Sequence, residues 1–312
     1  MTSTTASADL LADPLVAGSG AGLWRDTIGN VLRQRNARVG LIILGALTLI
    51  AIFADVLAAY DPNKVLFDAG VKRLTPPCIH LLGCPSTSPE LLFGVDTNGR
   101  DEFSRVLHGA RISLQVGFVT VGFAIVVGSL LGLVAGYAGG WLGSLIMRAM
   151  DVLLVFPALL LAIAIVSALG PGLINAQLAI AIVAIPVYAR IMRAAVLSVR
   201  EADFVVASRA LGASPAWILF RRILPNSLTP IVVAGTLGIA SAVLDVAALS
   251  FLGLGAQPPT AEWGSMVGLD RGNLFTAPHL IFFPGIFLAL TVFGFNLLGD
   301  GLRDALDPRL NR

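Results

Sequence analysis

The chain has 312 residues, of which 56% are hydrophobic and 13% are charged, and its formal net charge is +2. Soluble domains carry roughly 25% charged residues, so this composition excludes an ordinary soluble protein and indicates a polytopic membrane protein. The small net charge gives no indication of nucleic-acid binding. Residues 1–22 lack a basic stretch followed by an apolar core, so we expect a disordered tail and not a cleaved signal peptide.

Long apolar runs of the chain are sufficient to cross the roughly 30 Å hydrocarbon core of a bilayer as helices. A glycine-rich, turn-like stretch at 136–143 divides the longest run into two. The predicted spans are Val39–Tyr60, Ile112–Ala135, Leu145–Leu169, Leu173–Ala189, Ser227–Leu252 and His279–Gly299. The sequence therefore predicts an all-α membrane protein with six transmembrane helices and both termini on the same side.

The distribution of Lys and Arg predicts which side the termini occupy. With the N-terminus in the cytoplasm, 14 basic residues lie inside and 7 lie outside. We therefore expect cytoplasmic tails at 1–38 and 302–312, on either side of a transmembrane domain at 39–301. Within that domain, 61–110 is expected to be an extracytoplasmic loop and 200–226 a cytoplasmic loop.

The segment 61–110 contains both cysteines, Cys78 and Cys84, with five residues between them. On an oxidising face they form either a small disulfide loop or a pair of free thiols, and both alternatives stay open. Asp96–Asp101 begins like a calcium loop, but Arg100 stands where the spacing requires an oxygen ligand. We therefore expect a turn that leads into a helix there, and no metal site in the chain.

The loop 200–226 is rich in charge, yet it carries more apolar residues than a solvated loop needs. We expect the fourth span to continue as one helix to Leu211, where Gly212 suits the positive φ of a helix end. Ser214 fits the N-cap of a second helix, which Pro225 is expected to end. The apolar side chains indicate packing beneath the bundle, docking in a groove of a partner, or contact with anionic lipid.

A few polar residues near or inside the predicted spans are candidates for special roles. Asp245 lies in the fifth span, where a carboxylate is costly and often functional. Because no intramembrane His, Glu or Lys accompanies it, we expect a structural or pathway-lining role in place of proton transfer. Arg148 and Asp151 are expected to pair along one helix. The residues expected to anchor the end of the fourth span at the membrane surface are Tyr188, Arg190 and Arg193.

The loop 200–226 resembles the EAA loop of ABC importer permeases. Gly212 and Leu224-Pro225 match the glycine and the Leu-Pro of that pattern. At the Glu-Ala-Ala positions only Ala207 agrees, because Val206 stands where the glutamate is expected. Further segments resemble the C-type permease of dipeptide, oligopeptide and nickel importers, namely Phe93–Leu114, Met150–Ile163, Ala248–Met266 and Gly294–Arg309.

This resemblance implies the type I ABC importer permease fold in a bacterial plasma (inner) membrane. The implied partners are a homologous permease or a second copy of this chain, two cytosolic ATPases and an extracytoplasmic solute-binding protein. ATP and Mg²⁺ would be held by the ATPases, so we expect no cofactor and no enzymatic activity in this chain. The implied coupling residues are Ala207, Leu211, Gly212, Ala213, Ser214, Pro215, Trp217, Ile218, Phe220, Leu224 and Pro225.

The expected substrates are di- or oligopeptides. Nickel chelates, glutathione and oligosaccharides are alternatives within the same mechanism. A secondary transporter is a further alternative, but neither inverted repeats nor broken helices around polar midplane sites are evident in the sequence.

Overall fold

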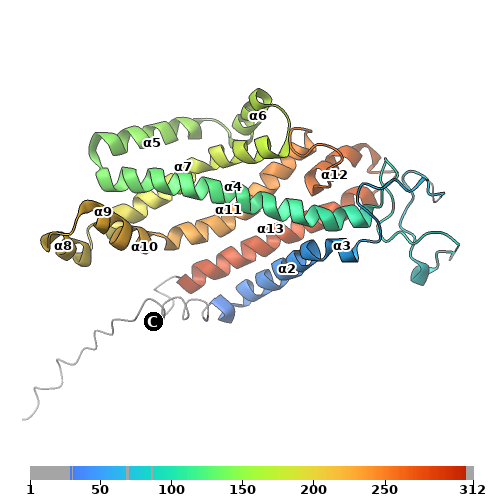
Figure 1. Cartoon of the computed structure of the whole chain (residues 1–312), viewed down its shortest axis with the longest axis horizontal. Coiled ribbons are helices and arrows are strands. Elements are labelled where there is room, and N and C mark those ends of the chain that lie inside the picture. Colours follow the sequence, from blue (N-terminus) through green and yellow to red (C-terminus); the bar gives the residue numbers. More distant parts are fainter. Residues whose placement is uncertain (1–28, 30, 68–69, 86, 307–312) are drawn as a thin grey trace, which may run out of the picture.

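The computed structural model describes residues 29, 31–67, 70–85 and 87–306; most of the two tails expected at 1–38 and 302–312 falls outside this part of the chain. The described part is built from helices, with a few isolated β-bridges near one end. The helices long and apolar enough to span a membrane lie roughly side by side (Figure 1). They are α2 (Arg35–Ile52), α4 (Glu102–Ala138), α7 (Leu173–Val199), α11 (Thr229–Phe251) and α13 (His279–Leu306).

The remaining predicted span, Leu145–Leu169, is not one straight helix. It consists of α5 (Gly140–Val155) and α6 (Ala158–Leu169), which are bent by 93° relative to each other. The bend follows from Pro157, because a proline disfavours the helical conformation of the residue before it. Phe156 accordingly adopts an extended ψ of 139°. Counted as one broken span, this pair completes the six-span architecture.

Several helices are longer than the sequence predicts. The helix α4 begins at Glu102, ten residues before the predicted span, because the Asp101 carboxylate caps it by accepting a hydrogen bond of 2.8 Å from the Ser104 backbone N–H. The last nine residues of the loop expected at 61–110 are therefore part of this helix, as the expected turn before a helix implies. With 37 residues and a rise of about 1.5 Å each, α4 is about 55 Å long and extends well beyond a bilayer core.

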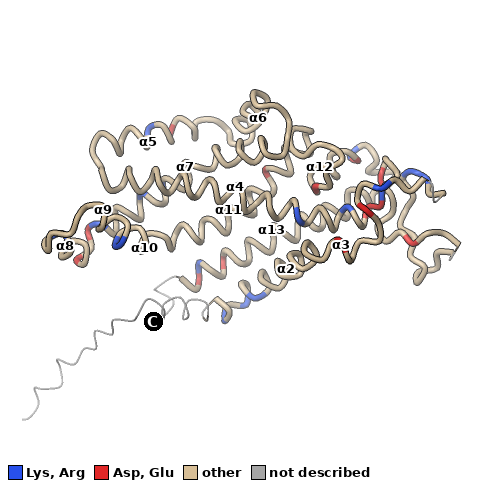
Figure 2. Tube along the Cα trace, in the orientation of Figure 1, with Lys and Arg blue, Asp and Glu red and all other residues tan. Residues whose placement is uncertain are grey.

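The two ends of the bundle differ in construction. The short helices α8 (Asp203–Ala210) and α9 (Pro215–Ile218) project from one end, and the largely irregular segment 58–101 covers the other (Figure 1). Most acidic and basic residues of the described chain lie towards these two ends, and the middle of the bundle holds few (Figure 2). This arrangement is what a membrane-spanning bundle requires.

In the segment 58–101, a disulfide joins Cys78 and Cys84, whose Cα atoms are 5.4 Å apart. The Asp96 carboxylate accepts hydrogen bonds from the backbone N–H groups of Asn98 and Arg100, which form the expected turn before α4. Buried Arg105 donates to the carbonyl oxygens of Pro62 and Pro259, so it ties this segment to the loop after α11. No group of three potential metal ligands occurs among the described residues.

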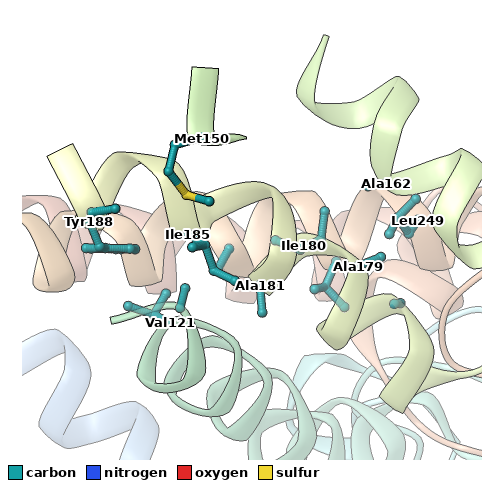
Figure 3. Packing of buried hydrophobic residues seen from close by; sticks show 14 of the residues in the cluster. Val121, Met150, Ala162, Ala179, Ile180, Ala181, Ile185, Tyr188 and Leu249 are labelled. Carbon is teal, nitrogen blue, oxygen red and sulfur yellow. The ribbon is translucent and has the colours of Figure 1, made fainter. Parts of the chain in front are cut away.

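The core of the bundle is the contact between α4 and α7 (Figure 3). Glycines four residues apart on α4 let the α7 backbone approach closely. A Cβ on Gly128 would lie 2.7 Å from the Ile185 carbonyl oxygen, and one on Gly136 would lie 2.8 Å from Val196 Cγ1. Between them, a Cβ on Gly132 would overlap the Ala189 carbonyl oxygen. Only glycine fits at these three positions, because any side chain would collide with α7.

We predict that Gly132→Ala lowers the thermal stability of the purified protein, because overpacking of a tight core costs about 1–3 kcal/mol. The matched control is Gly122→Ala on the same helix, where an added Cβ meets nothing within 4 Å. Since Ala is favoured over Gly in a helix by about 1 kcal/mol, the control should be unchanged or more stable. Equal melting temperatures of the two variants in detergent would contradict this account of the interface.

Candidate functional site: a helical hairpin at one end of the bundle

The segment 203–227, here called the terminal hairpin, consists of short helices joined by a sharp turn. α8 and α9 form its two arms, and a widened helical turn at Leu219–Ile223 leads into α10 (Leu224–Ser227). The spanning helix α11 follows directly, so the hairpin is continuous with α7 on one side and with α11 on the other. Any force on the hairpin therefore acts on two spans.

The turn between the arms has the geometry that the sequence predicts. Gly212 adopts a φ of 79°, and an L-residue is strained in this region. The Ala213 N–H donates to the Ser208 carbonyl and the Gly212 N–H to the Arg209 carbonyl, which is the Schellman pattern of a helix end. Ser214 caps α9 by accepting a hydrogen bond of 3.3 Å from the Trp217 N–H, and Pro215 occupies the first turn. The predictions for Gly212, Ser214 and Pro215 as turn and cap residues are confirmed.

The prediction of one continuous helix to Leu211 is wrong. The helix α7 ends at Val199, and the chain turns at 200–202 before α8 begins. Ala202 is extended, with a ψ of 146°, and the Arg200 guanidinium donates to the Gly136 carbonyl oxygen over 3.0 Å. This bond satisfies a carbonyl in the last turn of α4, so it joins the ends of α4 and α7 just before the hairpin.

Pro225 does not end the second helix, contrary to the expectation. The chain keeps helical dihedral angles from α9 through α10, because the turn at Leu219–Ile223 is widened by one residue. The Leu224 N–H bonds to the Leu219 carbonyl, five residues earlier, and such a widened turn leaves room for a proline ring that would clash in a regular helix.

The inner face of the hairpin is buried against the bundle. Val205, Ile218 and Ile223 are each at most 1% exposed, and they pack with Leu133 of α4 and Met192 of α7. Ile218 therefore anchors the hairpin and is not exposed to a partner, although the family resemblance implies that it is a coupling residue. Ala213 and Leu224, which are partly buried, pack against the same cluster.

The outer face of the hairpin is apolar and exposed. Leu211 at the turn is 88% exposed, and Phe220 and Trp217 are 56% and 42% exposed. The Arg222 guanidinium lies 5.1 Å from the centre of the Trp217 ring, so a cation–π contact orients this indole. Ala207, Gly212, Ser214, Pro215 and Pro225 are also exposed. Together these residues form an exposed, largely apolar ridge.

The other candidate residues lie away from the hairpin. Asp151 pairs with Arg190 of α7 at 2.6 Å, so the prediction that it pairs with Arg148 is wrong. The turn at Gly139 and Gly140, both with positive φ, brings α5 back along α4 and α7, and this cross-helix pairing depends on that packing. Tyr188 is 3% exposed and lies in the core, so it is not a surface anchor (Figure 3). Asp245 is half-buried and lines a small cavity between α4, α7 and α11.

Comparisons with known proteins agree with this architecture. The family described as binding-protein-dependent transport system inner membrane component matches residues 128–312, and the N-terminal TM domain of oligopeptide transport permease C matches residues 22–77. Two inward-facing structures of the MetNI methionine ABC transporter match with a TM-score of 0.54. Their sequences are 21% and 22% identical, and they cover 65% of this chain and 96% and 97% of theirs. At this low sequence identity, the structural similarity shows that the fold is shared and does not show a shared substrate.

Curated relatives are similar over nearly their whole length. The dipeptide transport system permease protein DppC of Alkalihalophilus pseudofirmus is 48% identical, covering 92% of this chain and 90% of the relative. The di/tripeptide transport system permease protein DppC of Pseudomonas aeruginosa is 46% identical over 89% of both chains. The glutathione transport system permease protein GsiD of Pectobacterium atrosepticum is 44% identical, and the match covers 92% of this chain and 91% of the relative.

The bundle of spans and the terminal hairpin are thus those of a permease subunit of an ABC importer, with the type I fold. The chain belongs to the binding-protein-dependent transport system inner membrane component family, as the C-type permease subunit.

We predict that Ile218→Ala loosens the terminal hairpin, because truncating a buried isoleucine costs about 2–5 kcal/mol. Trypsin should then cleave the folded protein faster at Arg209, Arg221 or Arg222, which are exposed on the hairpin. The matched control is Leu211→Ala, which removes an apolar side chain of similar size that is exposed and makes few contacts. The cleavage rate of this variant should equal that of the wild type. Equal rates for both variants would mean that Ile218 does not hold the hairpin.

Proposed function

We propose that this chain is the permease subunit of an ATP-driven, binding-protein-dependent importer of di- or oligopeptides. It forms half of the translocation pathway, and a homologous permease forms the other half. ATP hydrolysis resides in two cytosolic partner subunits, and an extracytoplasmic solute-binding protein delivers the substrate. The identity of 48% and 46% to a dipeptide and a di/tripeptide permease over nearly whole chains supports the substrate class.

The observation that carries the proposal is the two-faced construction of the terminal hairpin. Its inner face, with Val205, Ile218 and Ile223, is fixed to the bundle, whereas Leu211, Trp217 and Phe220 are left exposed. Exposed apolar ridges mark contact sites for partners. A partner that binds this ridge differently in its ATP-bound and ATP-free states shifts the bundle between conformations, since a shift in equilibrium requires differential binding.

The proposed orientation places the hairpin and both termini in the cytoplasm. The excess of Lys and Arg on that side supports it. So does the disulfide between Cys78 and Cys84 at the opposite end, because disulfides persist in oxidising compartments.

A second candidate substrate is glutathione. Relatives named as glutathione transport permeases are 44% to 45% identical to this chain, close to the values of the dipeptide permeases. Glutathione is itself a short peptide with a free amine, so the same pathway chemistry applies. Uptake assays with the cognate binding protein and radiolabelled dipeptide or glutathione distinguish the two.

We predict that Leu211→Asp weakens the association of the purified permease with its ATPase subunits about tenfold or more, because a charge replaces an apolar contact worth at least about 1.4 kcal/mol. The matched control is Leu81→Asp at the opposite end, where the leucine is 93% exposed. Co-purification and ATP-dependent uptake measure the effect. If Leu211→Asp retains both while the protein remains folded, the hairpin is not the ATPase contact.

The orientation is tested with single cysteines in a background where Cys78 and Cys84 are replaced by Ser. In intact cells, a membrane-impermeant maleimide should label Leu81→Cys and spare Leu211→Cys, because we place these residues outside and inside. In inside-out vesicles from cells that produce the permease without its ATPase subunits, so that Leu211→Cys is not covered, the labelling should be reversed. Labelling of Leu211→Cys in intact cells would overturn the orientation.

A further inference from the structure

A small cavity lies between α4, α7 and α11, away from the terminal hairpin. Its volume is about 190 Å³, and its polar lining residues are Thr120, Tyr188, Ser241 and Asp245. At roughly 30 Å³ per molecule, this space corresponds to about six waters. The cavity therefore has room for a charged group with its hydration water, but not for a complete peptide.

The polar groups of this cavity have no partners among the described residues. Thr120 Oγ1 is fully buried without a hydrogen bond, and Thr120 as a whole is 1% exposed. The Asp245 carboxylate and the Tyr188 hydroxyl meet no donor or acceptor of the described chain. Unpaired polar groups in a membrane-spanning bundle are costly, so their convergence at one cavity indicates that something else satisfies them.

The packing aims the tyrosine into this space. Gly238 lies on α11, and a Cβ there would overlap the Tyr188 hydroxyl oxygen. Because Gly238 has no side chain, the Tyr188 hydroxyl fits against α11 at this point. Ser241 and Asp245 of α11 line the same cavity. Ser241 is exposed, so the cavity is accessible from the face of α11 that carries it.

The charge of the lining specifies the ligand. Asp245 is the one charged residue among the described residues that line the cavity, and its carboxylate lacks a cation. An unpaired carboxylate that shares a cavity with three hydroxyl groups attracts a cation that donates several hydrogen bonds. A protonated primary amine fits, since it supplies one positive charge and three donors to carboxylate and hydroxyl acceptors.

We propose that Asp245, with Tyr188, Ser241 and Thr120, binds the protonated amino group of the substrate as it passes through the bundle. This inference rests on the proposed function, because it assumes that a peptide with a free amine traverses this chain. It assigns substrate contact to four residues on three helices, where the sequence offers Asp245 alone as a pathway-lining candidate.

The first test measures the charge preference of the cavity and does not depend on transport. Ser241→Cys is introduced into a background in which Cys78 and Cys84 are replaced by Ser, and the complex is treated with cationic or anionic methanethiosulfonate reagents of similar size. The quantity measured is the ratio of the reaction rate of the cationic reagent to that of the anionic reagent. We expect this ratio to be about tenfold higher in the Ser241→Cys variant than in the double variant that also carries Asp245→Asn. No difference between the reagents, or no effect of Asp245→Asn, would overturn the proposal.

The second test measures uptake of a dipeptide into proteoliposomes with the cognate binding protein. Asp245→Asn should lower kcat/KM about tenfold, and Asp245→Glu, which keeps the charge, should restore part of it. The matched control Asp300→Asn changes an exposed carboxylate on α13, outside the cavity, and should leave uptake unchanged. Unaltered uptake by Asp245→Asn would overturn the amine contact while leaving the importer function intact.

The two tests separate the possible failures. If the wild-type complex transports no peptide, the proposed function fails, and the reagent rates alone then show whether a cation site exists. If Asp245→Asn prevents co-purification of the second permease, the carboxylate pairs with a basic residue of that partner and the substrate contact is refuted.

Discussion

The close contact between α4 and α7 is the constraint on which the rest of the structure depends. It exists because Gly128, Gly132 and Gly136 remove side chains from one face of α4, so that the α7 backbone lies against it. In a membrane, burial of apolar surface contributes little to helix association, and such close packing is the main source of stability. At the far end of the contact, Arg200 donates to the Gly136 carbonyl oxygen and fixes the point where the chain leaves the bundle.

Both candidate sites depend on this pair of helices. The terminal hairpin follows α7, and its inner face packs on Leu133 of α4 and Met192 of α7. The cavity around Asp245 is closed by Thr120 of α4 and Tyr188 of α7, with the carboxylate on α11. In the proposed function, a displacement of the hairpin would be transmitted through this close-packed pair of helices to the cavity, which would give a physical route from a cytosolic partner to the pathway. Differential docking at the ridge around Leu211 would supply the free energy.

Much of this could be predicted from the sequence, and the exceptions have physical causes. Apolar runs predict the spans because the bilayer sets their length, and Gly212, Ser214 and Pro215 predict the turn because few residues suit those conformations. The bend at Pro157 was available in the sequence, but the apolar run on both sides of it favoured one span. The break after Val199 carries no local signal, since Arg200 is held by a carbonyl 64 residues earlier in the chain. Ile218 and Tyr188 are buried, whereas a coupling residue and a surface anchor were expected. The sequence could not show this, because the burial of a single residue depends on tertiary packing and not on the neighbouring residues in the chain.

The central claim is that the terminal hairpin moves together with α4 and α7, and a distance measurement tests it most directly. Spin labels at Arg209→Cys and at Leu130→Cys, which are both exposed and lie outside the apolar ridge, report the separation of the hairpin from α4 in the assembled complex. The account predicts that this distance changes by less than about 2 Å between the nucleotide-free and ATP-bound states, as for elements that move as one body. A change of about 5 Å or more, the size of one helical turn, would show that the hairpin moves independently and would contradict the account.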